Sequence, residues 1–198
     1  VAIRPDGYFV DKDIKTTSLP ALRVGRNELI VRTPISKRIS LENMFLLGDF
    51  GVRVEGCRAT VTALPEKLAF GSITHQGLPF YGGAVTYELP VTCDGTETEV
   101  LADTYAGALL NVRLDGAECG KIVYPPYRLP LGTVKAGQHT LELTVYASRV
   151  NCFGALHDNV DKRWKGPFMW YTQGGEWAYE YRLHDVGVLK SPEILHIK

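Results

Sequence analysis

The feature that most constrains the fold is an alternation of apolar and polar residues with a period of two. Several segments follow this pattern, and we predict strands at residues 29–32, 58–62, 84–89, 109–114, 140–146, 178–183 and 194–197. A period of two places alternate side chains on opposite faces of a strand, whereas an amphipathic helix needs a period of about 3.6 residues. No stretch of a dozen residues carries a helical pattern.

Glycine, proline and aspartate lie between these segments, as in Asp94-Gly95, Asp115-Gly116 and Gly174-Gly175. These residue types favour tight turns, so each pair of neighbouring segments is expected to fold back on itself. Many short strands joined by such turns are typical of an antiparallel sandwich or barrel. The sequence therefore predicts an all-β fold with antiparallel sheets.

Two stretches of the chain show the same order of features. Each has a Leu-Pro pair, then a glycine turn and an alternating strand: Leu19-Pro20 precedes Gly25, and Leu129-Pro130 precedes Gly137. Such an internal repeat predicts the tail of one β-sandwich in residues 1–64 and most of a second in residues 65–198, with the boundary at 63–77. The alternative is a chance similarity between β-hairpins.

The charge balance argues against one class of partner. The chain has 22 basic and 22 acidic residues and a formal net charge of zero, whereas a nucleic-acid-binding module carries a basic stripe. We therefore expect no nucleic-acid partner. No apolar run reaches the length of a membrane-spanning helix, so no membrane partner is expected either. The strand-like start at Val1 suggests a domain cut from a longer polypeptide.

The four cysteines, Cys57, Cys93, Cys119 and Cys152, lie far apart in the sequence. Zinc sites usually use pairs of ligands at close spacing, and no such pair occurs here. Reduced thiols in or near strands are the expected state, and two disulfide bridges are the alternative. The localisation is left open by this pattern.

A series of short motifs follows one order along the chain: Gly25-x-Asn27-x-Leu29-x-Val31, Phe45-Leu46-Leu47-Gly48-Asp49-Phe50-Gly51, Gly77-Leu78-Pro79-Phe80-Tyr81-Gly82-Gly83, Gly137-x-His139-x-Leu141-x-Leu143, Arg149-x-Asn151-x-Phe153-Gly154-x-x-His157, Gly166-Pro167-x-x-Trp170 and Trp177-x-Tyr179-x-Tyr181-x-Leu183. In this order they resemble the galactose-binding-like β-sandwich domains of large bacterial glycoside hydrolases, of the α-L-rhamnosidase-like and family-2-like kinds. The resemblance implies a jelly-roll sandwich that is accessory to a separate catalytic barrel.

The same resemblance implies a function and assigns no catalytic residue to this chain. It predicts a non-catalytic carbohydrate-binding or accessory domain. A structural calcium ion is also compatible with it, and Asp94-Gly95-Thr96-Glu97 is one candidate contributor, although this segment suits a hairpin turn equally well. No location for the ion is assigned.

Carbohydrate sites usually combine aromatic rings, which stack on the C–H faces of sugars, with side chains that bond hydroxyl groups. The chain places both kinds of residue after the predicted strand at 140–146. The predicted carbohydrate-binding residues are Arg149, Asn151, His157, Asp158, Trp164, Trp170 and Tyr171. The alternatives are that Trp170 and Trp177 cap the core or dock on another domain, and that Arg149 and Asn151 bond to loop backbone.

Three functions follow from these observations. The first is weak carbohydrate binding by an accessory domain, and the second is a structural module that docks on the catalytic domain of the same polypeptide. The third is a small free-standing hydrolase, which would need two carboxylates facing a sugar across a cleft. No spacing singles out two acidic residues for that role.

Overall fold

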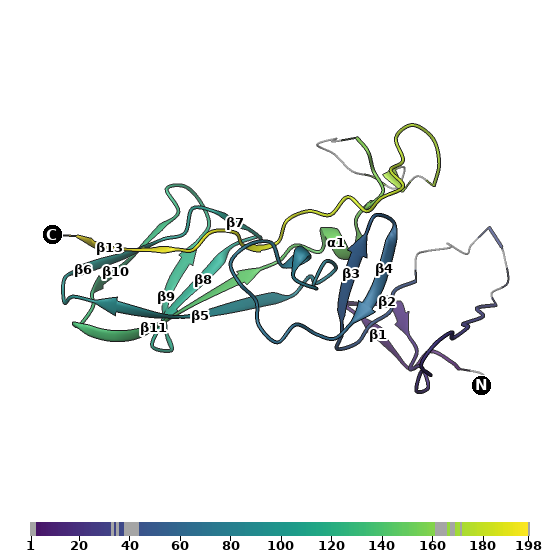
Figure 1. The fold of residues 1–198 in the computed structure, drawn as a ribbon, viewed down its shortest axis with the longest axis horizontal. Coiled ribbons are helices and arrows are strands. Elements are labelled where there is room, and N and C mark those ends of the chain that lie inside the picture. The colour runs from purple at the N-terminus through teal and green to yellow at the C-terminus, as the bar shows by residue number, and fades with distance from the viewer. Residues whose placement is uncertain are drawn as a thin grey trace. The chain divides into compact units, whose positions relative to one another are not determined.

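The computed structural model describes residues 3–32, 34, 36–37, 44–160, 166, 169–170 and 172–197 (Figure 1). Contacts between residues divide the chain into two compact units, Val1–Leu46 and Leu47–Lys198. This division falls before the boundary predicted at residues 63–77. The assignment of residues 1–64 and 65–198 to two sandwiches stays a prediction about domain origin.

The first unit contains one hairpin, formed by β1 (Gly7–Phe9) and β2 (Asp11–Thr16). The strand predicted at residues 29–32 is wrong, because the structure has no strand there. Leu29, Ile30 and Val31 are 57–67% exposed. A strand needs a neighbour to pair its backbone and cover its apolar face, and this segment has neither among the described residues. The alternating segment that ends the earlier copy of the internal repeat therefore forms no strand here.

The second unit is almost entirely β-structure. Its strands are β3 (Gly51–Glu55), β4 (Arg58–Thr62), β5 (Ala84–Cys93), β6 (Glu97–Leu101), β7 (Tyr105–Ala106), β8 (Leu110–Leu114), β9 (Ala117–Ile122), β10 (Arg128–Thr133), β11 (Gly137–Tyr146), β12 (Gly187–Val188) and β13 (Glu193–Ile197). Two short helices interrupt them, the 3-10 helix η1 (Ile73–His75) and α1 (Val150–Phe153). The strands predicted at 58–62, 84–89, 109–114, 140–146 and 194–197 are confirmed.

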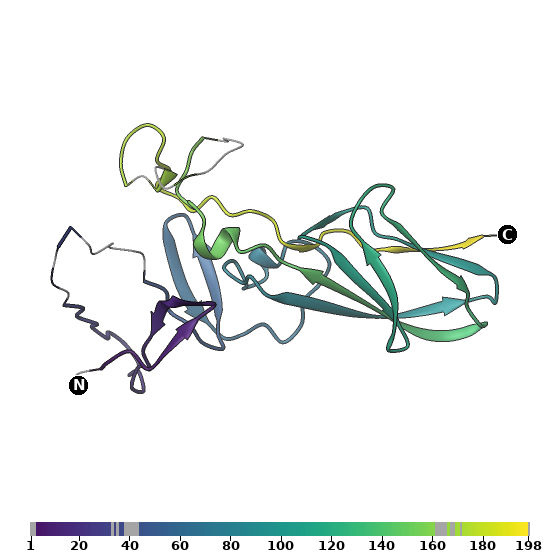
Figure 2. The same ribbon diagram turned by 180° about the vertical axis from the view of Figure 1, so that it is seen from behind.

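Two antiparallel sheets form the body of this unit. One has the strand order β5-β11-β8-β9 and the other β10-β6-β13. Figures 1 and 2 show the four strands of the first sheet side by side from both directions. The pairs β3–β4 and β7–β12 are separate two-stranded sheets. Antiparallel sheets on a shared core form a sandwich of jelly-roll type, which confirms the predicted fold class.

Strand β11 lies at the centre of the four-stranded sheet, between β5 and β8. Its residues Leu141, Leu143 and Val145 are completely buried and pack with Val100 of the other sheet. The alternate residues face outward, and Thr144 lies 2.8 Å from the Thr86 hydroxyl of β5. The alternation in the sequence therefore corresponds to one buried face and one polar face.

The turn at Asp94 joins β5 and β6. Asp94 Oδ1 accepts the Thr96 N–H (3.0 Å) and lies 3.1 Å from His196 Nδ1 on β13. These contacts describe a hairpin turn, in which the carboxylate bonds its own backbone two residues on. Among the described residues, no group of three or more His, Cys, Asp or Glu side chains is arranged to hold a metal ion.

Another aspartate ties the β8–β9 turn to the start of β11. Asp115 Oδ1 accepts the Thr140 N–H (2.8 Å), and Asp115 Oδ2 lies 2.6 Å from His139 Nδ1. His139 Nε2 lies 2.8 Å from the Lys135 carbonyl. Both acceptors lack a proton to donate, so the geometry fits a histidine with both nitrogens protonated. The bond to Asp115 raises the pKa of His139, and the bond to His139 lowers the pKa of Asp115.

We predict a pH-dependent stability from this pair. The contribution of His139 is full below its unfolded pKa and is lost as the pH rises through its raised folded pKa. The contribution of Asp115 is full above its unfolded pKa and is lost as the pH falls through its lowered folded pKa. Urea unfolding should therefore show a larger difference in the free energy of unfolding between the native protein and His139→Gln at pH 5.5 than at pH 8.5.

Asp115→Asn serves as the partner variant in that experiment. It should reproduce the loss seen with His139→Gln at pH 5.5, and the double variant should lose little more than either single variant. If His139→Gln lowers the free energy of unfolding equally at both pH values, the result would contradict the ion pair.

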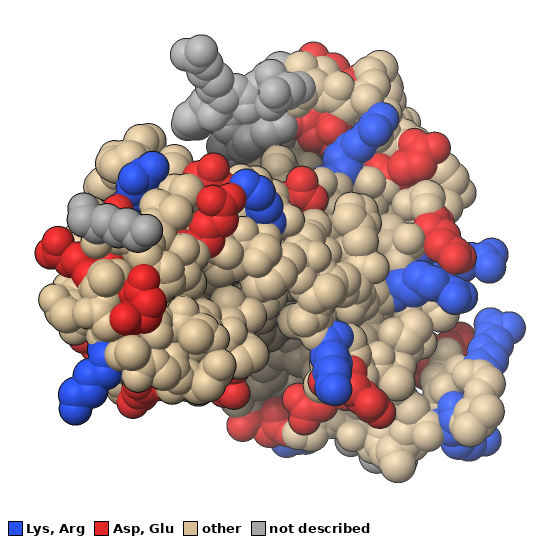
Figure 3. All heavy atoms as spheres, turned by 60° about the vertical axis from the view of Figure 1, so that its left-hand side comes forward, with Lys and Arg blue, Asp and Glu red and all other residues tan. Residues whose placement is uncertain are grey.

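Charged side chains of both signs are spread over the surface. Figure 3 shows lysine and arginine interspersed with aspartate and glutamate on one face of the molecule. Within the described part of the chain, no helix is both long enough and apolar enough to cross a membrane.

Candidate functional site

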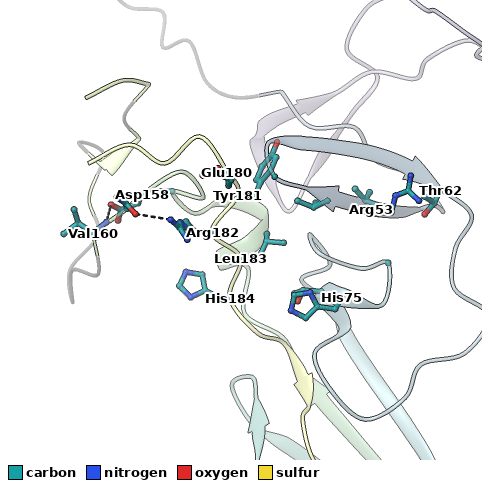
Figure 4. A pocket seen from close by; sticks show the side chains of 17 residues that line it. Arg53, Thr62, His75, Asp158, Val160, Glu180, Tyr181, Arg182, Leu183 and His184 are labelled. Carbon is teal, nitrogen blue, oxygen red and sulfur yellow. Dashed lines mark hydrogen bonds between the residues drawn. The ribbon is translucent and has the colours of Figure 1, made fainter. Parts of the chain in front are cut away.

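A pocket of about 1140 Å³ lies in the second unit, between the β3–β4 hairpin and two segments from the C-terminal third of the chain. Figure 4 shows the side chains that line it. The hairpin contributes one side, η1 and Gly77 contribute another, and residues 155–160 and 180–184 contribute the rest. The charged and imidazole side chains are Arg53, His75, Asp158, Glu180, Arg182 and His184.

The hairpin is held against Gly77 by the backbone. The Val52 N–H donates to the Gly77 carbonyl (2.8 Å). Gly51 allows this approach, because a Cβ atom there would lie 2.5 Å from the Ala63 carbonyl and 3.2 Å from that of Gly77. On the other side of the hairpin, the Tyr181 N–H donates to the Gly56 carbonyl (3.1 Å). The hairpin is therefore tied to two of the segments that line the pocket.

The segment 182–184 is fixed by a buried amide. Asn151, on α1, is 1% exposed. Its Nδ2 donates to the His184 carbonyl (2.8 Å), and its Oδ1 accepts the His184 N–H (3.0 Å). These two bonds mimic a pairing between neighbouring strands, and they hold the backbone of His184 while its side chain stays exposed.

The adjoining segment 186–188 is held by the residues around η1. The Gly71 N–H donates to the Val188 carbonyl (2.9 Å), and the Ile73 N–H donates to the Val186 carbonyl (2.8 Å). His75 directly follows one side of this paired region and His184 directly precedes the other, so the backbone pairing positions both histidines at the pocket.

Arg182 is the cation with the clearest geometry in the pocket. Its Nη2 donates to Asn159 Oδ1 (3.2 Å), and the side chain is exposed. Arg53 on the hairpin pairs with Glu55, whose Oε1 lies 3.3 Å from Nε. Asp158 is 7% exposed, and its Oδ1 accepts the Val160 N–H (3.0 Å). Figure 4 shows Asp158 and Val160 on the same side of the pocket as Arg182, and Arg53 on the opposite side.

An aromatic cluster adjoins the pocket at Tyr181. The His157 ring lies 4.6 Å from the Tyr181 ring and 6.0 Å from the Trp177 ring, measured between centroids. Trp177 contacts Tyr179 edge-on, and Tyr181 contacts Phe80 in the same way. His157 Nδ1 lies 2.9 Å from the Ala178 carbonyl, which requires a proton on Nδ1. Tyr181 belongs to both the cluster and the pocket.

The predicted binding residues are distributed over several places. Asp158 lines the pocket, whereas His157 packs in the aromatic cluster and Asn151 is buried against His184. Arg149 occupies the N-cap position of α1 without a side-chain capping bond, and Trp170 is 44% exposed beside the buried Met169. Trp164 and Tyr171 lie outside the described residues. Sequence reasoning missed Arg53, His75, Glu180, Arg182 and His184, since no local motif marks them.

The strand predicted at residues 178–183 is wrong. The N–H groups of this segment donate to carbonyls in different places, with Ala178 bonded to His157, Tyr181 to Gly56 and Arg182 to Leu156. Among the described residues, the one isolated bridge is Asp158–Trp177, which lies just before this segment. The segment connects the hairpin and the 155–160 loop, and this irregular course creates the pocket.

The chain matches no protein-family model and no curated protein. Among solved structures, it is similar to a rhamnosidase from Novosphingobium sp. PP1Y, with a TM-score of 0.43, 21% identity, 80% of this chain covered and 16% of that chain. It is also similar to the GH2 beta-galacturonidase from Eisenbergiella tayi bound to galacturonate (TM-score 0.35, 17% identity, coverage 58% and 20%). A third neighbour is the Bifidobacterium dentium beta-glucuronidase complexed with coumarin-3-O-glucuronide (0.32, 17%, 48% and 18%).

These three neighbours are glycoside hydrolases, and this chain spans at most 20% of the length of any of them. Identities of 17–21% and TM-scores below 0.5 are too low to assign a family or to carry an argument about the site.

Proposed function

We propose that the unit Leu47–Lys198 is a non-catalytic carbohydrate-binding domain that accompanies a glycoside hydrolase. The observation that carries this proposal is the polar pocket between the β3–β4 hairpin and the segments 155–160 and 180–184. Small-molecule pockets are usually about 300–1000 Å³, and this one is about 1140 Å³. It is therefore large enough to admit one or two sugar rings.

The side chains of the pocket match the groups that a neutral sugar presents. Arg182 offers several N–H donors in a fixed plane, Glu180 and Asn159 offer acceptors, and the two histidines offer either. Tyr181 adds an aromatic ring at the wall. Such mixed donors and acceptors suit hydroxyl groups better than a single charged group. The resemblance of the ordered sequence motifs to galactose-binding-like domains supports the same class of ligand.

A hydrolytic role is less well supported. Asp158 and Glu180 both line the pocket, as a glycosidase would require of its two carboxylates. However, Asp158 is almost fully buried, and one of its oxygens is bonded to the Val160 N–H in a local turn. A carboxylate in this position holds the loop that lines the pocket. Binding without cleavage is the simpler role for it.

The second candidate function is docking on the catalytic domain of the same polypeptide. One observation favours it: Met44, Phe45 and Leu46, at the end of the first unit, are 48–74% exposed. Consecutive apolar residues at the surface are typical of a contact with another protein surface. This function and sugar binding are compatible in one chain.

The histidines supply a direct test of the pocket. The chain has five, and only His75 and His184 line the pocket. We expect the ring C–H signals of these two histidines to shift on titration with methyl glycosides of galactose or rhamnose. His139, near the start of β11, and His196, near the end of β13, do not line the pocket and should not move. The measurement is two-dimensional NMR of the full chain.

Arg182→Gln is the informative variant, because it removes the charge and the planar donor set while keeping a polar side chain. The histidine shifts should then need a sugar concentration higher by roughly tenfold, the usual effect of losing one charge-assisted bond. Arg113→Gln, on the outer face of β8, is the matched control and should bind normally. Unmoved His75 and His184 signals at tens of millimolar sugar would contradict the pocket proposal for those sugars.

A further inference from the structure

The aromatic cluster beside the pocket is separate from the hydrophobic core of the sandwich. Its rings are those of Phe80, His157, Trp177, Tyr179 and Tyr181, and none of them belongs to the core that the described residues of the two sheets form. Tyr179 is 61% exposed, whereas Trp177 and Tyr181 are partly buried. The cluster therefore presents aromatic area to solvent at Tyr179 and lines the pocket at Tyr181.

Ring contacts connect the exposed tyrosine to the pocket in an unbroken series. Tyr179 and Trp177 lie edge-on, with ring centroids 5.8 Å apart and an angle of 78° between the ring planes. The Trp177 ring lies 6.0 Å from the His157 ring, and the His157 ring lies 4.6 Å from that of Tyr181. We call the two outer rings the Trp177–Tyr179 pair. Because the planes are nearly perpendicular, the two rings form an aromatic corner that adjoins the pocket.

The backbone that carries the pair is fixed on both sides. The Ala178 N–H donates to the His157 carbonyl in the loop that lines the pocket (2.6 Å). On the other side, the Tyr181 N–H donates to the Gly56 carbonyl of the β3–β4 hairpin (3.1 Å). Binding at the pair therefore needs little ordering of the backbone, which lowers the entropic cost of association.

The hairpin turn brings the pair next to polar groups of the pocket. Gly56 lies in this turn and lines the pocket, and a Cβ atom there would lie 3.9 Å from Glu180 Cγ. A hydrogen bond with the side chain of Cys57, the next residue of the turn, raises the pKa of Tyr179. Figure 4 shows Glu180 and Tyr181 side by side next to the end of the hairpin. Tyr179, which directly precedes Glu180, therefore lies at the edge of the pocket.

We propose that the ligand of the pocket is an oligosaccharide, with one sugar ring in the pocket and the next ring stacked on the Trp177–Tyr179 pair. This inference rests on the proposed function of the pocket. The pocket offers polar side chains to hydroxyl groups, and the pair offers apolar area to the C–H face of a pyranose. A saccharide chain presents both kinds of surface on neighbouring rings, so it matches a polar pocket that continues into an aromatic surface.

A peptide partner fits these contacts less well than a saccharide. Peptides bind in grooves lined by several apolar side chains, or they add a strand to an open sheet edge. Glu180 and Arg182, both exposed, lie on either side of Tyr181 in the sequence and line the pocket with it. Charged groups therefore flank the ring that joins the pair to the pocket, and such groups bond sugar hydroxyls well.

The number of sugar rings is the variable that tests this inference. Methyl β-galactoside, methyl α-rhamnoside, β-linked galactobiose and α-linked rhamnobiose are each titrated into the isotope-labelled full chain. The ring signals of His75 and His184 report on the pocket, and the indole N–H signal of Trp177 reports on the pair. We expect a monosaccharide to move the histidine signals only. The matching disaccharide should move all three signals and bind more tightly by roughly threefold to tenfold, the usual gain from one stacked ring.

Tyr179→Ala should remove the gain from the second sugar ring and leave the affinity for the monosaccharide unchanged. The variant should fold normally, because the Tyr179 side chain is mostly in solvent and the backbone bonds of Ala178 and Tyr181 are kept. Tyr179→Phe keeps the ring and should restore the gain. Tyr146→Ala, at the exposed end of β11, is the matched control and should bind both sugars as the native protein does.

The titrations separate a failure of this inference from a failure of the pocket proposal. If the histidine signals move with a monosaccharide but its disaccharide binds no more tightly, the inference is overturned and the pocket proposal stands. The same conclusion follows if Tyr179→Ala keeps the gain from the second ring. If neither histidine signal moves with any of the four sugars at tens of millimolar, the pocket proposal fails for these sugars and the inference fails with it.

Discussion

Replacing Gly187 by alanine should lower the free energy of unfolding by about 2–4 kcal/mol. Gly187 lies in β12 with a φ of 121°, a backbone conformation that residues with a side chain rarely adopt. An added Cβ would also meet the Tyr87 hydroxyl at 3.0 Å, the Gly71 carbonyl at 3.1 Å and Ile73 Cγ2 at 3.2 Å. Strain and crowding therefore act together at this position.

The matched control is Gly137→Ala, at the start of β11. Its φ is 141°, and a Cβ there would meet nothing within 4 Å. This variant carries the backbone strain without the crowding, so urea unfolding of the two variants separates the two effects. Equal losses of stability in Gly187→Ala and Gly137→Ala would show that crowding against Tyr87, Gly71 and Ile73 contributes nothing.

The strain introduced by Gly187→Ala should also affect the pocket. The segment 186–188 pairs with Gly71 and Ile73, and these bonds place His75 and His184. A shift of β12 away from Gly71 would separate the elements that line the pocket. Sugar binding at the pocket should then weaken in the folded Gly187→Ala protein.

The sandwich was predictable from the sequence because its strands bury one face only. In β11 the alternation of Leu141, Leu143 and Val145 with polar residues matches complete burial on one side. The glycine turns on either side then fix where neighbouring strands begin. Period and turn chemistry are local properties of the chain, so sequence alone is enough to find such strands.

The two strands that were predicted wrongly show what the alternation of apolar and polar residues does not predict. Residues 29–32 and 178–183 alternate as β11 does, but neither has a partner strand within the described part of the chain. In 178–183 the N–H groups bond to Gly56, Leu156 and His157 instead. Pairing depends on which distant segment lies alongside, and the sequence of one strand does not contain that information.

The pocket was not predictable for the same reason. Arg53 and Arg182 lie near opposite ends of the sequence of the second unit. The pocket forms only where the β3–β4 hairpin meets segment 180–184. Of the predicted binding residues that the structure describes, Asp158 alone lines the pocket. Asn151 was chosen as a polar residue after a strand, and the structure gives that residue a buried, supporting position. Residue type indicated polarity there but not exposure.

Asn151→Leu should lower the free energy of unfolding by about 2–4 kcal/mol, since it leaves both backbone groups of His184 without their partners. Leucine has a similar size, so the loss would come from hydrogen bonding and not from a cavity. Asn159→Ala is the control, because Asn159 is exposed and its side chain bonds the exposed Arg182 side chain among the described residues, and its effect should stay within about 0.5 kcal/mol. Urea unfolding measures both.

The two variants should also differ in the mobility of the pocket. Losing the Asn151 bonds should speed hydrogen exchange of the His184 amide strongly, because that N–H donates to Asn151 Oδ1. The Arg182 amide, which donates to the Leu156 carbonyl, should exchange faster as well. If the His184 amide keeps its native exchange rate in Asn151→Leu, then Asn151 does not hold this segment. The positions of His184 and Arg182 at the pocket would then depend on the pairing of residues 186–188 with Gly71 and Ile73.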